Sequence, residues 1–131
     1  MTVMKKLLTL TVILYSLIFS SVSFGEWTEV GTTKVGDTYY VDLERMRIHN
    51  GFKYLWRLSD FLEPTESGLL SASIYTQIDC KEFKMRNLQY VFYKQPMGEG
   101  SGDSHTSSDE DWVYPPPNSI EETIVKKVCE R

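Results

Sequence analysis

The sequence has few of the residues from which metal sites and catalytic centres are built. It contains two histidines and two cysteines in 131 residues, with no Cys-x-x-Cys pair and no Gly-x-Ser-x-Gly nucleophile motif. His49 and His105 lack companion carboxylates or thiols at the spacing that metal ligands require. The sequence therefore predicts no metal site, no cofactor and no catalytic residues. We expect a protein that is not an enzyme, and a hydrolase built on a carboxylate pair is the third hypothesis.

Positive charge is also scarce. The chain has 14 Lys and Arg against 18 Asp and Glu, which gives a formal net charge of −4. A surface of this sign does not attract the phosphate backbone of nucleic acids in general. We therefore expect no nucleic-acid partner.

The sequence has no apolar run of the length that spans a membrane. Leu7–Phe19 is about 13 residues long, whereas a transmembrane helix needs about 20. Two lysines precede the run and the small-residue segment Ser20–Gly25 follows it, which is the layout of a secretory signal peptide. We expect residues 1–25 to be cleaved after Gly25. Residues 26–131 would then form a single exported domain without a membrane span, in the periplasm, secreted or at the cell surface.

The two cysteines, Cys80 and Cys129, both lie in the predicted mature domain. An exported chain meets an oxidising environment, where an even pair of cysteines usually closes into a disulfide. A redox or metal-binding thiol pair would require a closer spacing and a nearby histidine. We therefore expect a Cys80–Cys129 disulfide.

Alternation of apolar and polar residues predicts an antiparallel sheet through the middle of the chain. The strands are expected at Glu26–Val30, Thr38–Asp42, Phe52–Phe61, Leu69–Cys80 and Phe83–Lys94. In the third strand, Phe52, Tyr54, Trp56 and Leu58 share one face, which we expect to be the apolar core face. The predicted fold class is α+β, a meander of about five to six strands with one solvated side.

Two segments follow the predicted sheet. Gln95–Asp111 is rich in Gly, Ser, Asp and Glu, which predicts a long mobile loop. Ser119 and Glu122 form a capping box that starts a C-terminal helix. Apolar residues recur through this helix at helical spacing, so we expect it to pack on the sheet. Cys129 borders this apolar stripe and could reach Cys80.

Aromatic residues make up 13% of the chain, and most of them are expected to build the core. Successive side chains in a strand point to opposite faces, so one member of each pair Tyr39-Tyr40 and Phe92-Tyr93 should face outward. Basic residues around the last predicted strand would add a positive stripe to the outer face. The candidate binding residues are Tyr39, Arg86, Tyr93 and Lys94.

The order of these features resembles the surface-adhesin protein E-like family of bacterial exported domains. The resemblance is carried by Glu26-Trp27, Tyr39-Tyr40-Val41-Asp42, Leu55-Trp56-Arg57-Leu58, Ile78-Asp79-Cys80, Arg86, a Gly-rich loop, Trp112, a Pro-x-Ser-x-x-Glu helix start and Val128-Cys129. It implies an antiparallel sheet to which a C-terminal helix is joined by the Cys80–Cys129 disulfide. It also implies a non-enzymatic binding role, with host matrix or plasma proteins as ligands of the member that names the family.

The leading functional hypothesis is an exported, adhesin-like module that binds host or extracellular proteins through its sheet face or an edge strand. Exposed edges would also allow a homodimer. The alternative hypothesis is a periplasmic inhibitor or accessory factor that docks on an enzyme through the acidic segment 99–111.

Overall fold

The computed structural model describes residues 26–107 and 110–130. The predicted signal peptide, residues 1–25, lies outside the described residues. The elements are β1 (Thr28–Thr32), β2 (Thr38–Val41), β3 (Arg47–His49), β4 (Phe52–Asp60), β5 (Ser71–Asp79), β6 (Lys84–Tyr93), the 3-10 turn η1 (Pro96–Gly98), β7 (Gly102–Thr106) and the helix α2 (Ile120–Cys129).

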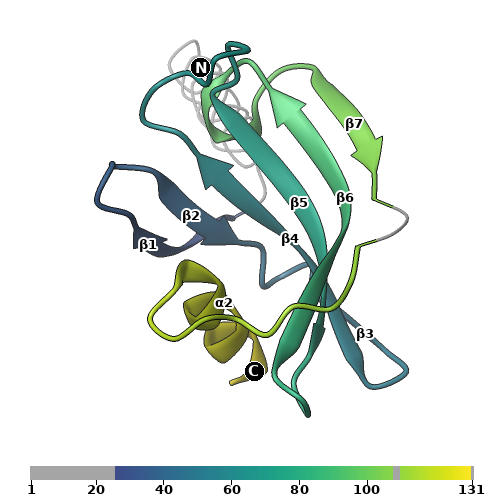
Figure 1. Ribbon diagram of the computed structural model, residues 1–131. Helices are drawn as coiled ribbons and strands as arrows, with labels where there is room; N and C mark the ends of the chain where they lie inside the picture. Colours follow the sequence, from purple (N-terminus) through teal and green to yellow (C-terminus); the bar gives the residue numbers. More distant parts are fainter. Residues whose placement is uncertain (1–25, 108–109, 131) are drawn as a thin grey trace, which may run out of the picture.

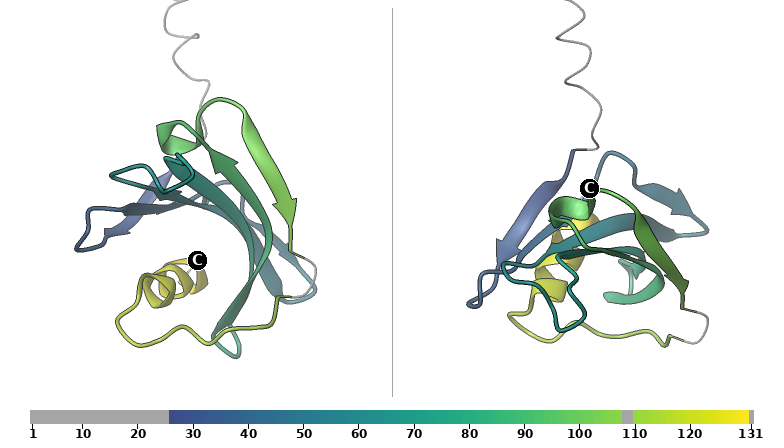
Figure 2. Two further views of the ribbon diagram at one scale, coloured as in Figure 1. Left: turned by 45° about the horizontal axis from the view of Figure 1, so that its top comes forward. Right: turned by 90° about the horizontal axis from the view of Figure 1, so that it is seen from above.

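The strands form one seven-stranded antiparallel sheet in the order β1-β2-β4-β5-β6-β7, and β3 pairs with β4 beside β2 (Figure 1). Apart from the short β3, neighbours in the sheet follow one another in the chain, which confirms the predicted meander and the α+β fold class. The sheet is strongly curved, and α2 lies within its concave side (Figure 2, left). Two strands, β3 and β7, were not predicted. β3 pairs with the start of β4 across the turn at Asn50-Gly51, and β7 forms one edge of the sheet.

The core lies between α2 and the concave face of the sheet. Ile124, Val125 and Val128 of the helix are fully buried and join one cluster with the strand residues Val41, Leu55, Ile78 and Met85. The helix begins where the capping box predicts, because the Ser119 hydroxyl accepts a hydrogen bond of 3.1 Å from the backbone N–H of Glu122. Burial of this narrow apolar stripe, rather than the propensity of ten residues alone, keeps so short a helix folded.

Two links fasten the end of α2 to the sheet. Cys80, which follows β5, and Cys129 form the predicted disulfide across 49 residues of sequence. Beside it, the Lys53 ammonium of β4 donates a hydrogen bond of 3.1 Å to the Val128 carbonyl. A cation at this position also faces the negative end of the helix dipole.

The predicted core face of β4 is wrong for Tyr54 and Trp56, whereas Leu58 on the same face is 1% exposed and buried beside Gly98. Leu55, 1% exposed, is the β4 residue in the core beneath α2, so Tyr54 and Trp56 on either side of it point to the opposite face. Lys53 and Arg57 share the helix side because both find partners there. Lys53 binds the helix end, and the Arg57 guanidinium donates to Thr76 and to a β6 side chain.

The predicted mobile loop Gln95–Asp111 is also wrong over part of its length. It contains η1 and the strand β7, which pairs with the second half of β6. The composition of β7, Gly-Asp-Ser-His-Thr, lacks the alternation by which strands are recognised, and its pairing instead satisfies the backbone of the longer β6. Gly102 permits this approach, because a Cβ there would lie 2.3 Å from a Val91 methyl carbon.

Candidate functional site

The sheet face opposite α2, here called the open face, carries a row of aromatic side chains. The alternation of β4 places Tyr54 and Trp56 on it, and the register sets Trp56 directly opposite Tyr75 of β5. The rings of Trp56 and Tyr75 are 5.1 Å apart, and Tyr54 stacks on Tyr75 at 6.2 Å with an interplanar angle of 25°. All three side chains are partly exposed. The sheet therefore presents a fixed aromatic surface to solvent.

Two hollows adjoin this aromatic row. One, of about 280 Å³, is bordered by Trp27, Trp56 and Tyr93. The other, of about 330 Å³, is lined by Arg47, His49, Tyr54 and Tyr75. Trp56 lines the first hollow and Tyr75 lines the second, so the contact between these two rings links the two hollows.

A chain of hydrogen bonds links Tyr54, which lines the second hollow, to Arg86. The Arg86 Nε donates to Gln77 Oε1 at 2.7 Å, and the Gln77 amide donates to the Tyr54 hydroxyl at 2.9 Å. The Arg86 guanidinium also lies 4.7 Å from the centroid of the Trp112 ring, a cation–π arrangement. These contacts fix the orientation of a long side chain that would otherwise sample many rotamers.

Trp112 lies at the end of the open face that carries Lys84 and Arg86. Its ring is 5.5 Å from that of Phe52, and the Lys84 ammonium lies 4.9 Å from its centroid. A backbone bridge between Met85 and Val113 holds the segment that carries Trp112 against β6. Lys84 is in turn paired with Glu82, so its charge is partly compensated.

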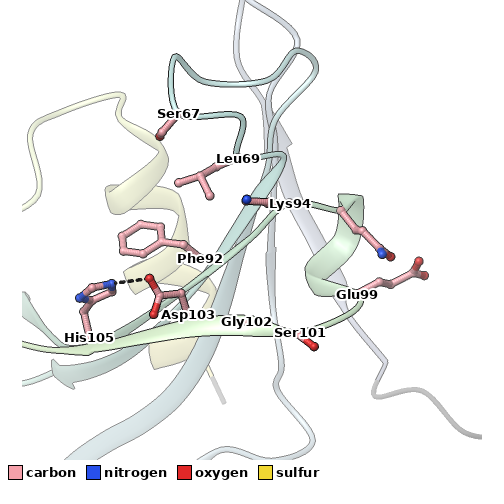
Figure 3. A pocket seen from close by; sticks show the side chains of 10 residues that line it. Ser67, Leu69, Phe92, Lys94, Glu99, Ser101, Gly102, Asp103 and His105 are labelled. Carbon is pink, nitrogen blue, oxygen red and sulfur yellow. Dashed lines mark hydrogen bonds and ion pairs between the residues drawn. The ribbon is translucent and has the colours of Figure 1, made fainter.

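A third hollow, of about 690 Å³, lies at the end of β6 and β7 (Figure 3). Phe92 and Leu69 supply apolar surface, and the His105 Nε2 lies 3.1 Å from an Asp103 carboxylate oxygen. Within the described residues no serine hydroxyl hydrogen-bonds to His105, so the His–Asp pair does not complete a nucleophilic triad. Both partners are more than half exposed, and a solvated ion pair of this kind contributes little energy.

The concave face holds a buried polar network beside α2. Arg57, 8% exposed, donates to Thr76 at 3.0 Å and to Asn87 at 2.8 Å. Tyr90 donates to the Glu110 carboxylate at 2.8 Å, which secures the segment after β7 to the sheet. Burial lowers the pKa of the Arg57 guanidinium, whereas burial and then the hydrogen bond to Glu110 raise the pKa of Tyr90. Because these hydrogen bonds join β4, β5 and β6 to the segment that carries Glu110, we assign the network a structural role.

Two structural features are absent from the described part of the chain. Residues 26–107 and 110–130 contain no cluster of three His, Cys, Asp or Glu side chains that could hold a metal ion. No helix among them is long and apolar enough to cross a membrane.

The family of the chain is decided by its match to a sequence model. The model for surface-adhesin protein E matches residues 27–130. The chain belongs to the surface-adhesin protein E family. Solved structures agree at the level of fold. Crystal form II of Haemophilus influenzae protein E aligns with a TM-score of 0.63 at 14% identity, covering 83% of this chain and 90% of that one.

Protein E from non-typeable Haemophilus influenzae gives a TM-score of 0.58 at 15% identity, with 83% of this chain and 78% of that chain covered. At such identities the likeness shows the shared fold alone. A comparison with curated proteins gives no match. Membership of a surface-adhesin family confirms the expected export of the protein.

The candidate binding residues of this adhesin E family member lie on two sides of the sheet. Arg86 is on the open face, and Tyr93 borders its first hollow. Tyr39 faces the other way, in a hollow beside the start of α2, and Lys94 lines the hollow of Figure 3. The four residues therefore do not form one site, and Arg86 and Tyr93 are the pair that shares a surface.

The main feature of this surface could not be read from the sequence. Tyr54 and Trp56 were expected in the core, because aromatic residues at alternate positions are usually buried. The same strand did contain a sign of the observed orientation. Leu55 points to the face opposite Tyr54 and Trp56 and is an equally suitable core residue. The short apolar stripe of α2 needs few partners, and Leu55 meets that need without the aromatic residues.

Proposed function

We propose that this adhesin E family member is a non-enzymatic binding module that holds a host or extracellular protein on the open face of its sheet. The observation that carries the proposal is the row Tyr54, Tyr75 and Trp56, partly exposed beside a positioned Arg86. Tyr, Trp and Arg are the residue types that dominate the binding energy of protein interfaces. Contiguous apolar surface that is left exposed beside polar groups is typical of protein–protein interaction sites.

The construction of the open face also supports a binding role. The aromatic residues stand on adjacent strands of one sheet and contact one another, so little side-chain freedom remains to be lost on association. The hydrogen bonds from Arg86 to Gln77 and from Gln77 to Tyr54 hold the polar groups in the same way. A preformed surface of this kind lowers the entropic cost of binding a ligand.

The experiment compares single substitutions on the open face with a matched control. Trp56→Ser and Tyr75→Ser should each weaken binding at least tenfold to whichever protein binds in a panel of purified matrix and plasma proteins, measured by surface plasmon resonance. Val35→Ser is the control, because Val35 is 72% exposed in the β1–β2 turn. Circular dichroism melts check that each variant is folded. Undiminished binding by both aromatic variants would contradict the proposal.

A second candidate function is favoured by β7. This strand ends the sheet and all of its residues are exposed, so its outer backbone groups are open to a partner strand. The segment 99–111 could thus dock on an enzyme as an inhibitor or accessory factor, or pair with a second copy to form a homodimer. Asp103→Asn would then weaken binding while Trp56→Ser would not, and sedimentation velocity would detect the dimer.

A further inference from the structure

Four residues of the open face are paired in register across four strands. Arg47 of β3 pairs with Tyr54 of β4, Tyr54 pairs with Gln77 of β5, and Gln77 pairs with Arg86 of β6. Directly opposed residues of antiparallel strands project from the same face. Because neighbouring strands are about 4.8 Å apart, the Cα atoms of the two arginines are separated by about 14 Å.

The two arginines at the ends of this row retain uncompensated charge. Neither Arg47 nor Arg86 forms an ion pair with any residue that the structure describes. Two acids close to Arg86 in the sequence are engaged elsewhere: Glu82 pairs with Lys84, and the buried Asp79 accepts hydrogen bonds from the backbone after β5. Between the arginines lie the neutral Tyr54 and Gln77.

We propose that the ligand of this row is an extended acidic peptide segment with carboxylates four residues apart, an inference that rests on the proposed function. An extended chain advances about 3.3 Å per residue, so positions i and i+4 are about 13 Å apart, which matches the separation of Arg47 and Arg86. Side chains i, i+2 and i+4 of such a segment share one face. The carboxylates then meet the guanidinium forks, while an apolar side chain at i+2 enters the hollow of Tyr54 and Tyr75.

The charge distribution favours discrete carboxylates over a long polyanion. Residues 26–131 contain twelve Lys and Arg against eighteen Asp and Glu, a net charge of about −6. A continuous chain of sulfates or phosphates would be repelled by this field along most of its length. Two cations separated by an aromatic floor instead complement two acidic side chains separated by an apolar one.

The test uses a defined peptide and the folded chain that lacks residues 1–25. The probe is acetyl-Glu-Ser-Phe-Ser-Glu-amide, the control probe replaces both Glu by Gln, and binding is followed by chemical-shift changes in ¹⁵N-labelled protein. The Glu peptide should bind at least tenfold more tightly. Arg47→Gln and Arg86→Gln should each lower its affinity about tenfold, the loss expected for one charge-assisted hydrogen bond. Lys34→Gln, which removes an exposed charge at the β1–β2 turn, should leave the affinity unchanged.

Several results would overturn the inference. Equal affinity of the Glu and Gln peptides, or no saturable binding of either, would do so. Heparin binding that requires both arginines, without binding of the Glu peptide, would show a polyanion site instead. The proposed function is tested separately by the protein ligand. If Trp56→Ser abolishes its binding while Arg47→Gln and Arg86→Gln do not, the open face remains the interface and only the acidic partner is refuted.

Discussion

Removing the Cys80–Cys129 disulfide should destabilise the protein more than most single changes on its surface. The perturbation is the double variant Cys80→Ala, Cys129→Ala, in which both sulfurs are absent and no free thiol remains. The bond joins two residues that are 49 positions apart in the sequence and closes the loop between them. Chain-entropy arguments give about 4 kcal/mol for a loop of this length, which is a large fraction of the roughly 5–15 kcal/mol by which small domains are stable.

This free energy converts into a large shift of the melting temperature. The entropy of unfolding is about 2.1 cal/mol/K per residue near 60 °C, or about 0.22 kcal/mol/K for a domain of about 106 residues. The double variant should therefore melt about 18 °C below the oxidised protein. The helix α2 should detach first, since Lys53 would then be its remaining polar link to the sheet at that end.

The assay is thermal unfolding by circular dichroism of the oxidised protein, the reduced protein and the double variant. Reduced protein and double variant should melt together, and reductant should not move the melt of the double variant. A decrease below about 5 °C for both would refute the reasoning, because it would mean that the loop is already constrained in the unfolded state or that the helix is held by other contacts. Free thiols in native material would refute it at an earlier step.

Two further predictions concern β7 and the partly buried tyrosines. In Gly102→Ala, the added methyl group would clash with Val91 and should separate β7 from β6. Amide hydrogen exchange should therefore become faster over Gly102–Thr106 but not in β5. Unchanged exchange would show that the pairing of β7 with β6 does not depend on glycine at this position. Burial raises the pKa of Tyr39, Tyr40 and Tyr90, so the stability they contribute is full below about pH 10 and is lost as the pH rises through their folded values. Urea unfolding between about pH 8 and pH 11 should show this loss of stability, and the loss should be smaller in Tyr90→Phe. A free energy of unfolding that rises with pH over this range would contradict the prediction.

The fold class could be predicted because its signals are local. Alternation over eight to ten residues indicated β4, β5 and β6, and the Ser119–Glu122 capping box indicated the start of α2. The disulfide followed from the number of cysteines and the expected compartment. β3 and β7 could not be predicted in this way. β3 has three residues, all exposed, and β7 has no apolar residue, so both owe their conformation to pairing with a longer neighbour.

The open face could not be predicted because alternation shows that a strand has two faces but not which one meets the core. In β4 the choice was decided by α2, whose three buried residues require only a narrow strip of sheet. Leu55 supplies that strip, and Lys53 and Arg57 can share its side because a helix carbonyl and neighbouring side chains bind them.

The consequence of this choice is the binding surface itself. The helix α2 covers one face of the curved sheet, and the η1 segment covers only the Leu58 end of the other face. The part of β4 and β5 that carries the aromatic row must therefore be stable while partly facing solvent. Tyr54, Tyr75 and Trp56 meet this requirement because aromatic rings bury area against one another and still expose an edge or a face. The same property makes them contact residues for a partner. In this fold, therefore, the residues that complete the uncovered side of the sheet are also the residues that can bind, and a substitution such as Trp56→Ser should affect binding more than stability.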